Sequence, residues 1–199
     1  MSDEVKQVSL AAATPNPAAL GLAGFGVTTF ILSMFNAGFL PAAATLVVLG
    51  PAAFYGGLAQ LLAGQQEYKT GNVFGATAFS TYGAFWLSFA FFQLMAAIGV
   101  FKFGGAAGAA AGIFLIGFTI FNTYMWIASF KVSVAVCTIF TTLEITFILL
   151  DVGAFGHSAI FAWGGYFGII CALSALYTSA AIVLNTVYKK VVLPIGPLD

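Results

Sequence analysis

Six long, unbroken apolar runs constrain this chain more than any other feature. They cover Ala18 to Phe39, Ala42 to Ala63, Phe74 to Gly99, Ala106 to Trp126, Val132 to Leu150 and Ile160 to Val187. A helix needs roughly 20 largely apolar residues to cross the hydrocarbon core of a bilayer. Because 61% of the 199 residues are hydrophobic and only 6% are charged, the chain has too little polar surface for a soluble globule. We therefore expect an integral membrane protein surrounded by a lipid bilayer.

The runs favour helices over a β-barrel. A barrel strand alternates lipid-facing and lumen-facing residues over about ten positions, whereas these runs are continuous and rich in Ala and Leu. Turn and charge signals separate them at Gly38 to Pro41, Gln65 to Asn72, Lys102 to Gly105, Ser129 to Lys131 and Asp151 to Ser158. The predicted fold class is an all-α integral membrane protein with six transmembrane helices per protomer.

The lysines predict the orientation of the chain, since it contains no Arg. A cytoplasmic N-terminus places five of the six lysines on the cytoplasmic side and leaves only Lys102 outside. An even number of spans then returns the C-terminus to the cytoplasm. We expect a cytoplasmic tail over residues 1–15, a six-helix transmembrane domain over 16–188 and a second cytoplasmic tail over 189–199.

Polar side chains inside the runs are costly in lipid and therefore informative. Thr28 lies in the first run, Gln60 in the second, and Thr81 and Tyr82 in the third. A Thr hydroxyl often bonds a carbonyl of its own helix, so the threonines have a structural explanation. Gln60 and Tyr82 lack one. Trp86 also sits deep in its run, where a large aromatic side chain needs a partner, a pore or a packed core.

Two helix starts carry asparagines. Asn16-Pro17 precedes the first run and Thr70-Gly71-Asn72 precedes the third, and both lie at the predicted cytoplasmic face. Free backbone N–H groups and the positive end of the helix dipole suit such places to an anion. Simple helix capping by Asn explains both equally well. The sequence leaves the two alternatives open.

Glu144 is the acidic residue that lies well inside a run, and Asp151 follows seven positions later on the same helix face, roughly 10 Å away. A charged group at this depth has to face water, find a partner or be protonated. A proton-coupling or pore-lining role and a hydrogen-bonded structural role both remain open for Glu144.

The residue types for other chemistry are missing. His157 has no second His or Cys near it in the sequence, and no phosphate loop or base-activated nucleophile is present. We expect no enzymatic activity, no metal site and no cofactor. A net charge of zero gives no reason to expect a nucleic-acid partner.

Several motifs run in order along nearly the whole chain. They are Asn16-Pro17-x-x-Leu20-Gly21-Leu22-x-Gly24-Phe25-Gly26, Phe54-Tyr55-Gly56-Gly57-x-Ala59-Gln60-x-x-Ala63-Gly64, Glu67-Tyr68-Lys69-x-Gly71-Asn72-x-Phe74-Gly75, Thr77-Ala78-Phe79-x-x-Tyr82-Gly83-x-Phe85-Trp86, Cys171-x-x-Ser174-Ala175-x-Tyr177 and Val192-Leu193-Pro194-Ile195-Gly196. With these motifs the chain resembles the acetate uptake transporter family. Ala19 departs from the family pattern, which usually has a second proline there.

The resemblance implies a six-helix protomer around a narrow pore, assembled as a homo-oligomer that in this family is a hexamer. It implies an apolar pore constriction formed by Phe25, Tyr82 and Leu143, with Leu143 placed by its distance from Lys131. Ala175 matches a small residue linked to substrate selection. Asn16, Thr28, Gln60, Asn72, Thr81 and Trp86 are the other residues expected along the substrate path.

Function follows from the same resemblance. We expect multi-pass placement in a prokaryotic plasma membrane and transport of acetate, with succinate and other short carboxylates as further substrates. The route is either an anion channel or a symporter in which protons accompany the acid. The alternative function is a channel for ammonia, ammonium or another small neutral solute.

Overall fold

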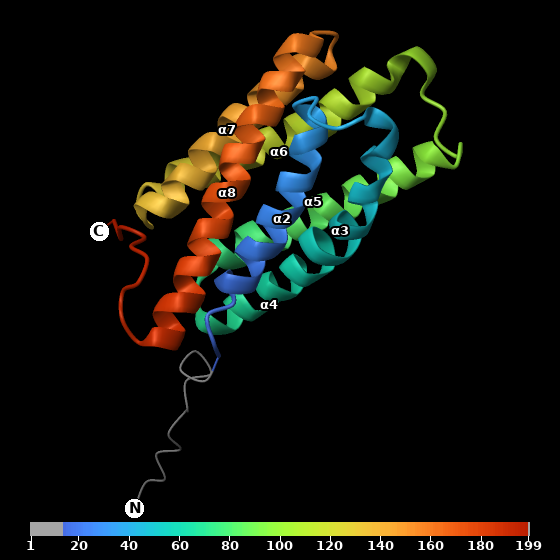
Figure 1. Ribbon diagram of the computed structural model, residues 1–199. Helices are drawn as coiled ribbons and strands as arrows, with labels where there is room; N and C mark the ends of the chain where they lie inside the picture. Colours follow the sequence, from blue (N-terminus) through green and yellow to red (C-terminus); the bar gives the residue numbers. More distant parts are fainter. Residues whose placement is uncertain (1–13, 199) are drawn as a thin grey trace, which may run out of the picture.

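The computed structural model describes residues 14–198, which form the helical bundle of Figure 1. Its elements are α2 (Ala18–Asn36), the 3-10 segment η1 (Ala42–Val48), α3 (Leu49–Ala53), the π segment η2 (Phe54–Ala59), α4 (Gln60–Thr70), α5 (Val73–Ala97), the 3-10 segment η3 (Gly104–Ala106), α6 (Ala107–Ser129), α7 (Val134–Ala154) and α8 (Ser158–Tyr188). The predicted all-α class is confirmed.

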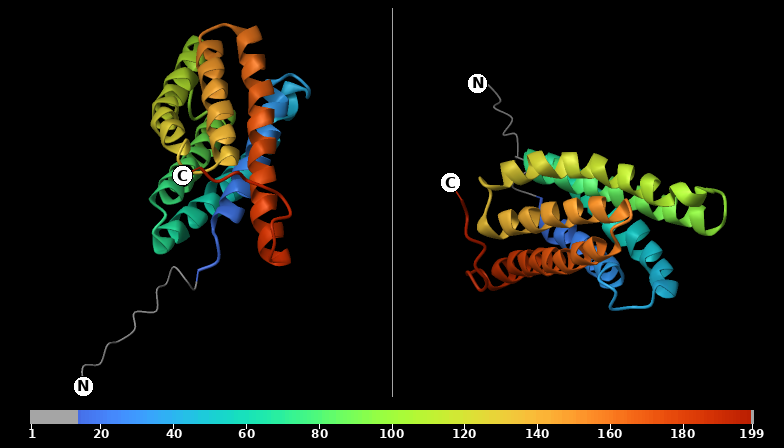
Figure 2. Two further views of the ribbon diagram at one scale, coloured as in Figure 1. Left: turned by 90° about the vertical axis from the view of Figure 1, so that its left-hand side faces the viewer. Right: turned by 90° about the horizontal axis from the view of Figure 1, so that it is seen from above.

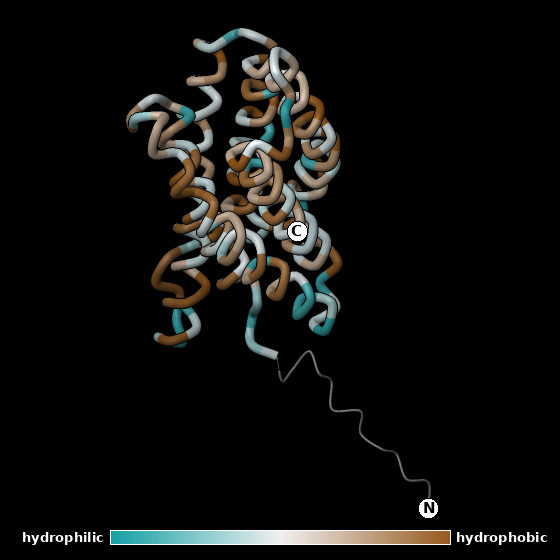
Figure 3. Tube along the Cα trace, turned by 90° about the vertical axis from the view of Figure 1, so that its right-hand side faces the viewer, coloured by the Kyte–Doolittle hydropathy of each residue, from teal (hydrophilic) through white to brown (hydrophobic). Residues whose placement is uncertain are grey.

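Five helical segments within residues 14–198 are long and apolar enough to cross a membrane: Ala18–Asn36, Ala42–Thr70, Gly104–Ser129, Val134–Ala154 and Ser158–Tyr188. The remaining predicted run corresponds to α5, which has 25 residues but carries polar side chains such as Ser80, Thr81 and Gln93. Hydrophobic residues follow the helices along most of their length (Figure 3). Large apolar side chains such as Ile113 and Val187 are exposed on the outside of the bundle, as a lipid-facing surface requires.

The second apolar run forms a composite helix. It begins with 3-10 geometry, becomes α-helical and widens to a π-helix over Phe54–Ala59 before α4 continues it. A π segment changes the hydrogen-bond register, and here the Pro51 carbonyl accepts a hydrogen bond from Thr28 Oγ1 of α2 at 3.3 Å. Pro51 lies in α3, three residues before the π segment, so this bond links the composite helix to α2.

Two predicted breaks are wrong in extent. Gln65 to Asn72 was expected to be a turn, but α4 runs through it to Thr70 because Gln, Glu and Lys are good helix formers. Gly71 ends the helix with a φ of +77°, a conformation that favours glycine. Similarly, α7 continues past Asp151 to Ala154.

The first predicted run, by contrast, is too long. α2 ends at Asn36 rather than at Phe39, and Gly38 turns the chain with a φ of +79°.

Small residues let the helices approach closely. α2 packs most extensively on α8, and α8 also packs along α7, as two perpendicular views show (Figure 2). A Cβ atom added to Gly165 of α8 would collide with the backbone of Asn36 and Ala37. One added to Gly168 would collide with the Ser33 side chain. The glycines of α8 therefore pack within the protomer.

After α8 the chain folds back onto the beginning of α7. The amides of Val134 and Ala135 donate to the carbonyls of Gly196 and Ile195, at 2.6 and 3.0 Å. Helix starts leave amides without intrahelical partners, and the C-terminal segment satisfies two of them. Ile195 is thereby placed beside an internal cavity.

Candidate functional site

Two cavities lie in line inside the bundle. The first has a volume of about 230 Å³ and reaches the end of the bundle where α2, α5 and α7 begin, since Asn16, Asn72 and Ser133 line it. The second has a volume of about 160 Å³ and reaches toward the opposite end, with Asn36 and Gln93 among its lining residues. Together the two cavities extend from one end of the bundle toward the other.

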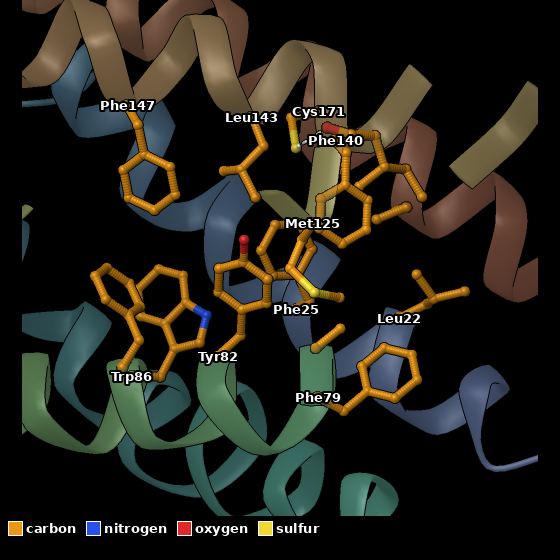
Figure 4. Close-up of a cluster of buried hydrophobic side chains, with 14 of the residues drawn as sticks. Leu22, Phe25, Phe79, Tyr82, Trp86, Met125, Phe140, Leu143, Phe147 and Cys171 are labelled. Atoms are coloured by element: carbon orange, nitrogen blue, oxygen red, sulfur yellow. Dashed lines mark hydrogen bonds between the residues drawn. The ribbon is translucent and has the colours of Figure 1, made fainter. Parts of the chain in front are cut away.

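Three residues separate the cavities. Among the described residues, only Phe25, Tyr82 and Leu143 line both of them. Each is at most 5% exposed, and the rings of Phe25 and Tyr82 lie 5.7 Å apart between centroids. They come from α2, α5 and α7 and gather in the core (Figure 4). We call this group the neck; it consists of the three residues expected to form a constriction.

Glycines bring the helices of the neck together. A Cβ atom on Gly21 of α2 would overlap the Phe79 ring of α5, and one on Gly24 would meet the Tyr55 carbonyl. On α5, a Cβ atom on Gly83 would meet the backbone of Leu61. Close approach of this kind is how helices associate in lipid without a hydrophobic driving force. Gly21 brings α2 directly against α5, and Gly24 and Gly83 pack these two helices on the composite helix between Ala42 and Thr70. The Phe25 and Tyr82 rings are in contact within this arrangement.

The asparagines at the cavity's outer end accept hydrogen bonds from backbone amides at two helix starts. Asn16 Oδ1 accepts from the Ala18 amide at 2.9 Å. Asn72 Oδ1 accepts from the Gly75 amide at 3.1 Å, and its Nδ2 donates to Glu67 Oε2 at 2.9 Å. Both side chains line the first cavity. Asn72 is thus the N-cap of α5, whereas Asn16 precedes the N-cap residue Pro17 and satisfies the first amide of α2. Of the two alternatives that the sequence left open, bonding of helix-start amides by Asn is present at both places.

Buried polar atoms without a partner lie beside both cavities. Gln60, 1% exposed, lines the first cavity, and its Oε1 has no hydrogen bond within the described chain. Trp86, 2% exposed, lines the second, and its Nε1 also lacks a described partner. Such atoms are costly to bury, so each is suited to meet a polar solute in its cavity.

The other expected path residues lie elsewhere. Thr28, Thr81 and Ala175 line neither cavity. Thr28 is fully buried and donates to the Pro51 carbonyl, while Ala175 is fully buried in the core cluster that also contains the neck residues. Their position allows an effect on the path through packing rather than through contact with a solute.

Glu144 has partners for both of its oxygens. Asn122 Nδ2 donates to Oε2 at 2.6 Å and Thr123 Oγ1 donates to Oε1 at 2.8 Å. The carboxyl is 7% exposed and lines neither cavity. Asp151, about two turns further along α7, accepts a hydrogen bond from Thr119 Oγ1 at 2.7 Å. Of the roles left open for Glu144, this geometry favours a hydrogen-bonded structural one.

Asn122 was missed in the sequence. It is completely buried on α6, and its Oδ1 accepts a hydrogen bond from the Tyr82 hydroxyl at 2.5 Å. The available signal was a lone Asn in the middle of the fourth apolar run, where a polar side chain is costly. Its partners lie 40 and 22 positions away, so spacing does not reveal them.

Comparison with known proteins assigns the chain to a family. The model of the GPR1/FUN34/yaaH family matches residues 4–199. The chain belongs to this family. The result confirms the resemblance to the acetate uptake transporters that the motifs indicated, and with it a multi-pass membrane protein.

Individual relatives extend over most of the chain. The chain is 39% identical over 182 residues to the "Succinate-acetate/proton symporter SatP" of Escherichia coli (strain K12), covering 91% of this chain and 95% of the relative. It is also 39% identical over 170 residues to "Ammonia transport outward protein 2" of Saccharomyces cerevisiae, covering 83% of this chain and 60% of the relative. The solved "Structure of the bacterial acetate channel SatP" is similar with a TM-score of 0.86 and 38% identity, covering 92% of this chain and 99% of that one.

Proposed function

We propose that the protein transports acetate, and with it succinate and other short carboxylates, across the membrane through the two cavities and the neck. The observation that carries this proposal is the pair of cavities in line, joined at Phe25, Tyr82 and Leu143 alone among the described residues. The similarity to a succinate-acetate symporter and to an acetate channel supports the choice of substrate.

The neck supplies selectivity in this proposal. Phe25 and Leu143 present only carbon to the path, and an apolar constriction disfavours hydrated ions because they lose water there. A short carboxylic acid has an apolar end that the Phe25 and Tyr82 rings accommodate. Solutes larger than acetate pass more slowly because the two rings are in close contact, with their centroids 5.7 Å apart.

Polar groups on each side of the neck serve as substrate contacts. Gln60 faces the first cavity and Trp86 the second, each with a buried polar atom that lacks a partner in the described chain. Asn16 and Asn72 stand at the mouth of the first cavity. A solute passing along the path thus meets polar groups before and after the apolar neck.

For topology and assembly, we propose six spans with both termini in the cytoplasm and a homohexamer with one pore per protomer. Five segments of sufficient length and hydropathy, with α5 as the sixth, support the number of spans. The lysine distribution supports the orientation. Similarity to the Escherichia coli symporter SatP and to the solved bacterial acetate channel SatP supports the homohexamer and placement in a prokaryotic plasma membrane. The transmembrane domain is residues 16–188, with tails over 1–15 and 189–199.

A channel for ammonia is the second candidate, because one relative at 39% identity is named for ammonia transport. An apolar neck also passes small neutral molecules. The two functions differ in their substrates, so uptake of labelled acetate and labelled methylammonium by the same proteoliposomes separates them. Acetate uptake above that of protein-free liposomes supports the proposed function. Methylammonium uptake without acetate uptake contradicts it.

A further inference from the structure

Asn122 connects the neck to a buried carboxyl group. The Asn122 side chain accepts from the Tyr82 hydroxyl, donates to the Phe140 carbonyl at 3.4 Å and donates to Glu144 Oε2 at 2.6 Å. Asn122 is completely buried, so these contacts are not shared with bulk solvent. The amide therefore lies between α5, which carries Tyr82, and α7, which carries the other two partners.

The partners on α7 fix which way the amide faces. A backbone carbonyl only accepts hydrogen bonds, and so does an ionised carboxylate. The amide nitrogen of Asn122 must then face Phe140 and Glu144, which leaves Oδ1 toward Tyr82. A reversed amide would place its oxygen against the Phe140 carbonyl oxygen and leave buried groups unsatisfied, which is costly. The hydrogen bond to Glu144 is the shorter of the two, and it holds the Asn122 amide in this orientation.

This orientation determines what Tyr82 offers in the neck. A tyrosine hydroxyl has a single proton to donate, and here that proton goes to Asn122. The oxygen keeps only acceptor capacity. Phe25 and Leu143 have no polar side-chain atoms. The three side chains of the neck thus provide a solute with no hydrogen-bond donor.

We propose that Asn122, held by Glu144, is a positioning residue that keeps the Tyr82 hydroxyl proton in a hydrogen bond to its own side chain. The neck therefore passes the un-ionised carboxylic acid in preference to the carboxylate. The inference rests on the proposed transport of short carboxylates. The acid brings its own proton and donates to the Tyr82 oxygen, whereas a carboxylate only accepts and gains nothing in exchange for lost water. The carboxylate takes up a proton from water before the neck, and the acid releases it to water beyond.

The charges around the neck agree with this proposal. The described groups that interact electrostatically with Tyr82 are Glu144 on α7, Tyr124 on α6 and Cys171 on α8, and Asp151 interacts in turn with Glu144. All of them are neutral or acidic. The described side chains that line the two cavities include no Lys, Arg or His. No cationic side chain of this described lining therefore compensates a carboxylate in the low-dielectric neck.

The test measures whether acetate carries charge through the neck. Purified protein is placed in liposomes, a membrane voltage is imposed with potassium and valinomycin, and initial uptake of labelled acetate is corrected for protein-free liposomes. Wild-type uptake is expected to be unchanged by voltage. At fixed total acetate it is expected to rise about tenfold per unit of external pH decrease near neutrality, because carboxyl groups there are almost fully ionised.

Two variants separate positioning from general loosening of the neck. Asn122→Leu removes the acceptor and releases the Tyr82 proton, so acetate uptake is expected to become at least severalfold faster when the interior is positive. In Asn122→Leu/Tyr82→Phe the released donor is absent, and this voltage response is expected to disappear. A neck that is merely wider would keep the response in the double variant.

The outcomes are distinct. Wild-type uptake driven by voltage, or a voltage response that persists in the double variant, overturns the inference and leaves acetate transport intact. No acetate uptake by the wild type overturns the proposed function itself. The wild-type measurement decides the question even if Asn122→Leu does not assemble.

Discussion

Replacing Phe25 by Ala removes one wall of the neck. Phe25 is 5% exposed, contacts the Tyr82 ring and lines both cavities. Without its ring, we expect the two cavities, of about 230 and 160 Å³, to join into one continuous space. We expect Phe25→Ala to speed the uptake of acids larger than acetate relative to acetate itself.

The size of the effect follows from what the neck excludes. An apolar site discriminates by about 1–3 kcal/mol per methylene group, and butyrate has two more than acetate. At the lower limit the wild-type neck favours acetate by about 2 kcal/mol, or about thirtyfold, since about 1.4 kcal/mol corresponds to a factor of ten. Phe25→Ala is expected to lower the ratio of acetate uptake to butyrate uptake by at least about tenfold, toward one.

Initial uptake of labelled acetate and labelled butyrate by proteoliposomes measures this ratio. Phe118→Ala is the matched control: it removes the same ring from α6, where Phe118 packs on Phe85 at 4.8 Å but lines neither cavity. Removing a buried Phe ring costs about 3–5 kcal/mol of stability in packed cores, so both variants are compared at equal folded amounts. An unchanged ratio in Phe25→Ala, or an equal change in Phe118→Ala, would refute the assignment of the neck.

Three further predictions concern packing, capping and the buried carboxyl. Gly165→Ala is expected to reduce the folded yield and thermal stability sharply because its Cβ would meet the backbone of α2. Gly117→Ala has open space around it and is expected to be neutral or slightly stabilising. Equal melting temperatures for the two variants would contradict this prediction. Ser133→Ala loses the hydrogen bond from the Val136 amide that caps α7 and is expected to cost about 1 kcal/mol, measured as a lower melting temperature in detergent. Glu144→Leu is expected to change the pH dependence of acetate uptake more than Glu144→Gln, which keeps an acceptor for Asn122. An equally large change in both variants would instead support a proton-coupling role, because both lack the carboxyl group.

Two of the three neck residues lie in ordered motifs, so the family resemblance names them before the structure is known. Their role as a constriction for a solute stays a prediction. Phe25 and Tyr82 follow directly from those motifs, and the weaker placement of Leu143 by its distance from Lys131 also brings it to the two cavities. Roles that depend on side-chain direction are less predictable. Thr28 and Ala175 lie in the right helices but face the core rather than a cavity.

Helix boundaries and buried networks required the structure. Polar composition suggested a turn from Gln65 to Asn72, yet helix formers with an apolar helix before them extend α4 until Gly71. Asn122 is a single polar residue whose meaning depends on three partners from two other helices. No local pattern in α6 specifies those partners, because they are brought together only by tertiary packing.

Closing the neck tests the transport path most directly. Leu143→Trp places a larger side chain where the two cavities meet, and correct assembly is checked by gel filtration of the purified protein. Initial uptake of labelled acetate by proteoliposomes is then compared with the wild type. The proposed path predicts robust wild-type uptake and a fall in Leu143→Trp to near the protein-free level. Wild-type rates of acetate uptake in a correctly assembled Leu143→Trp protein would contradict it.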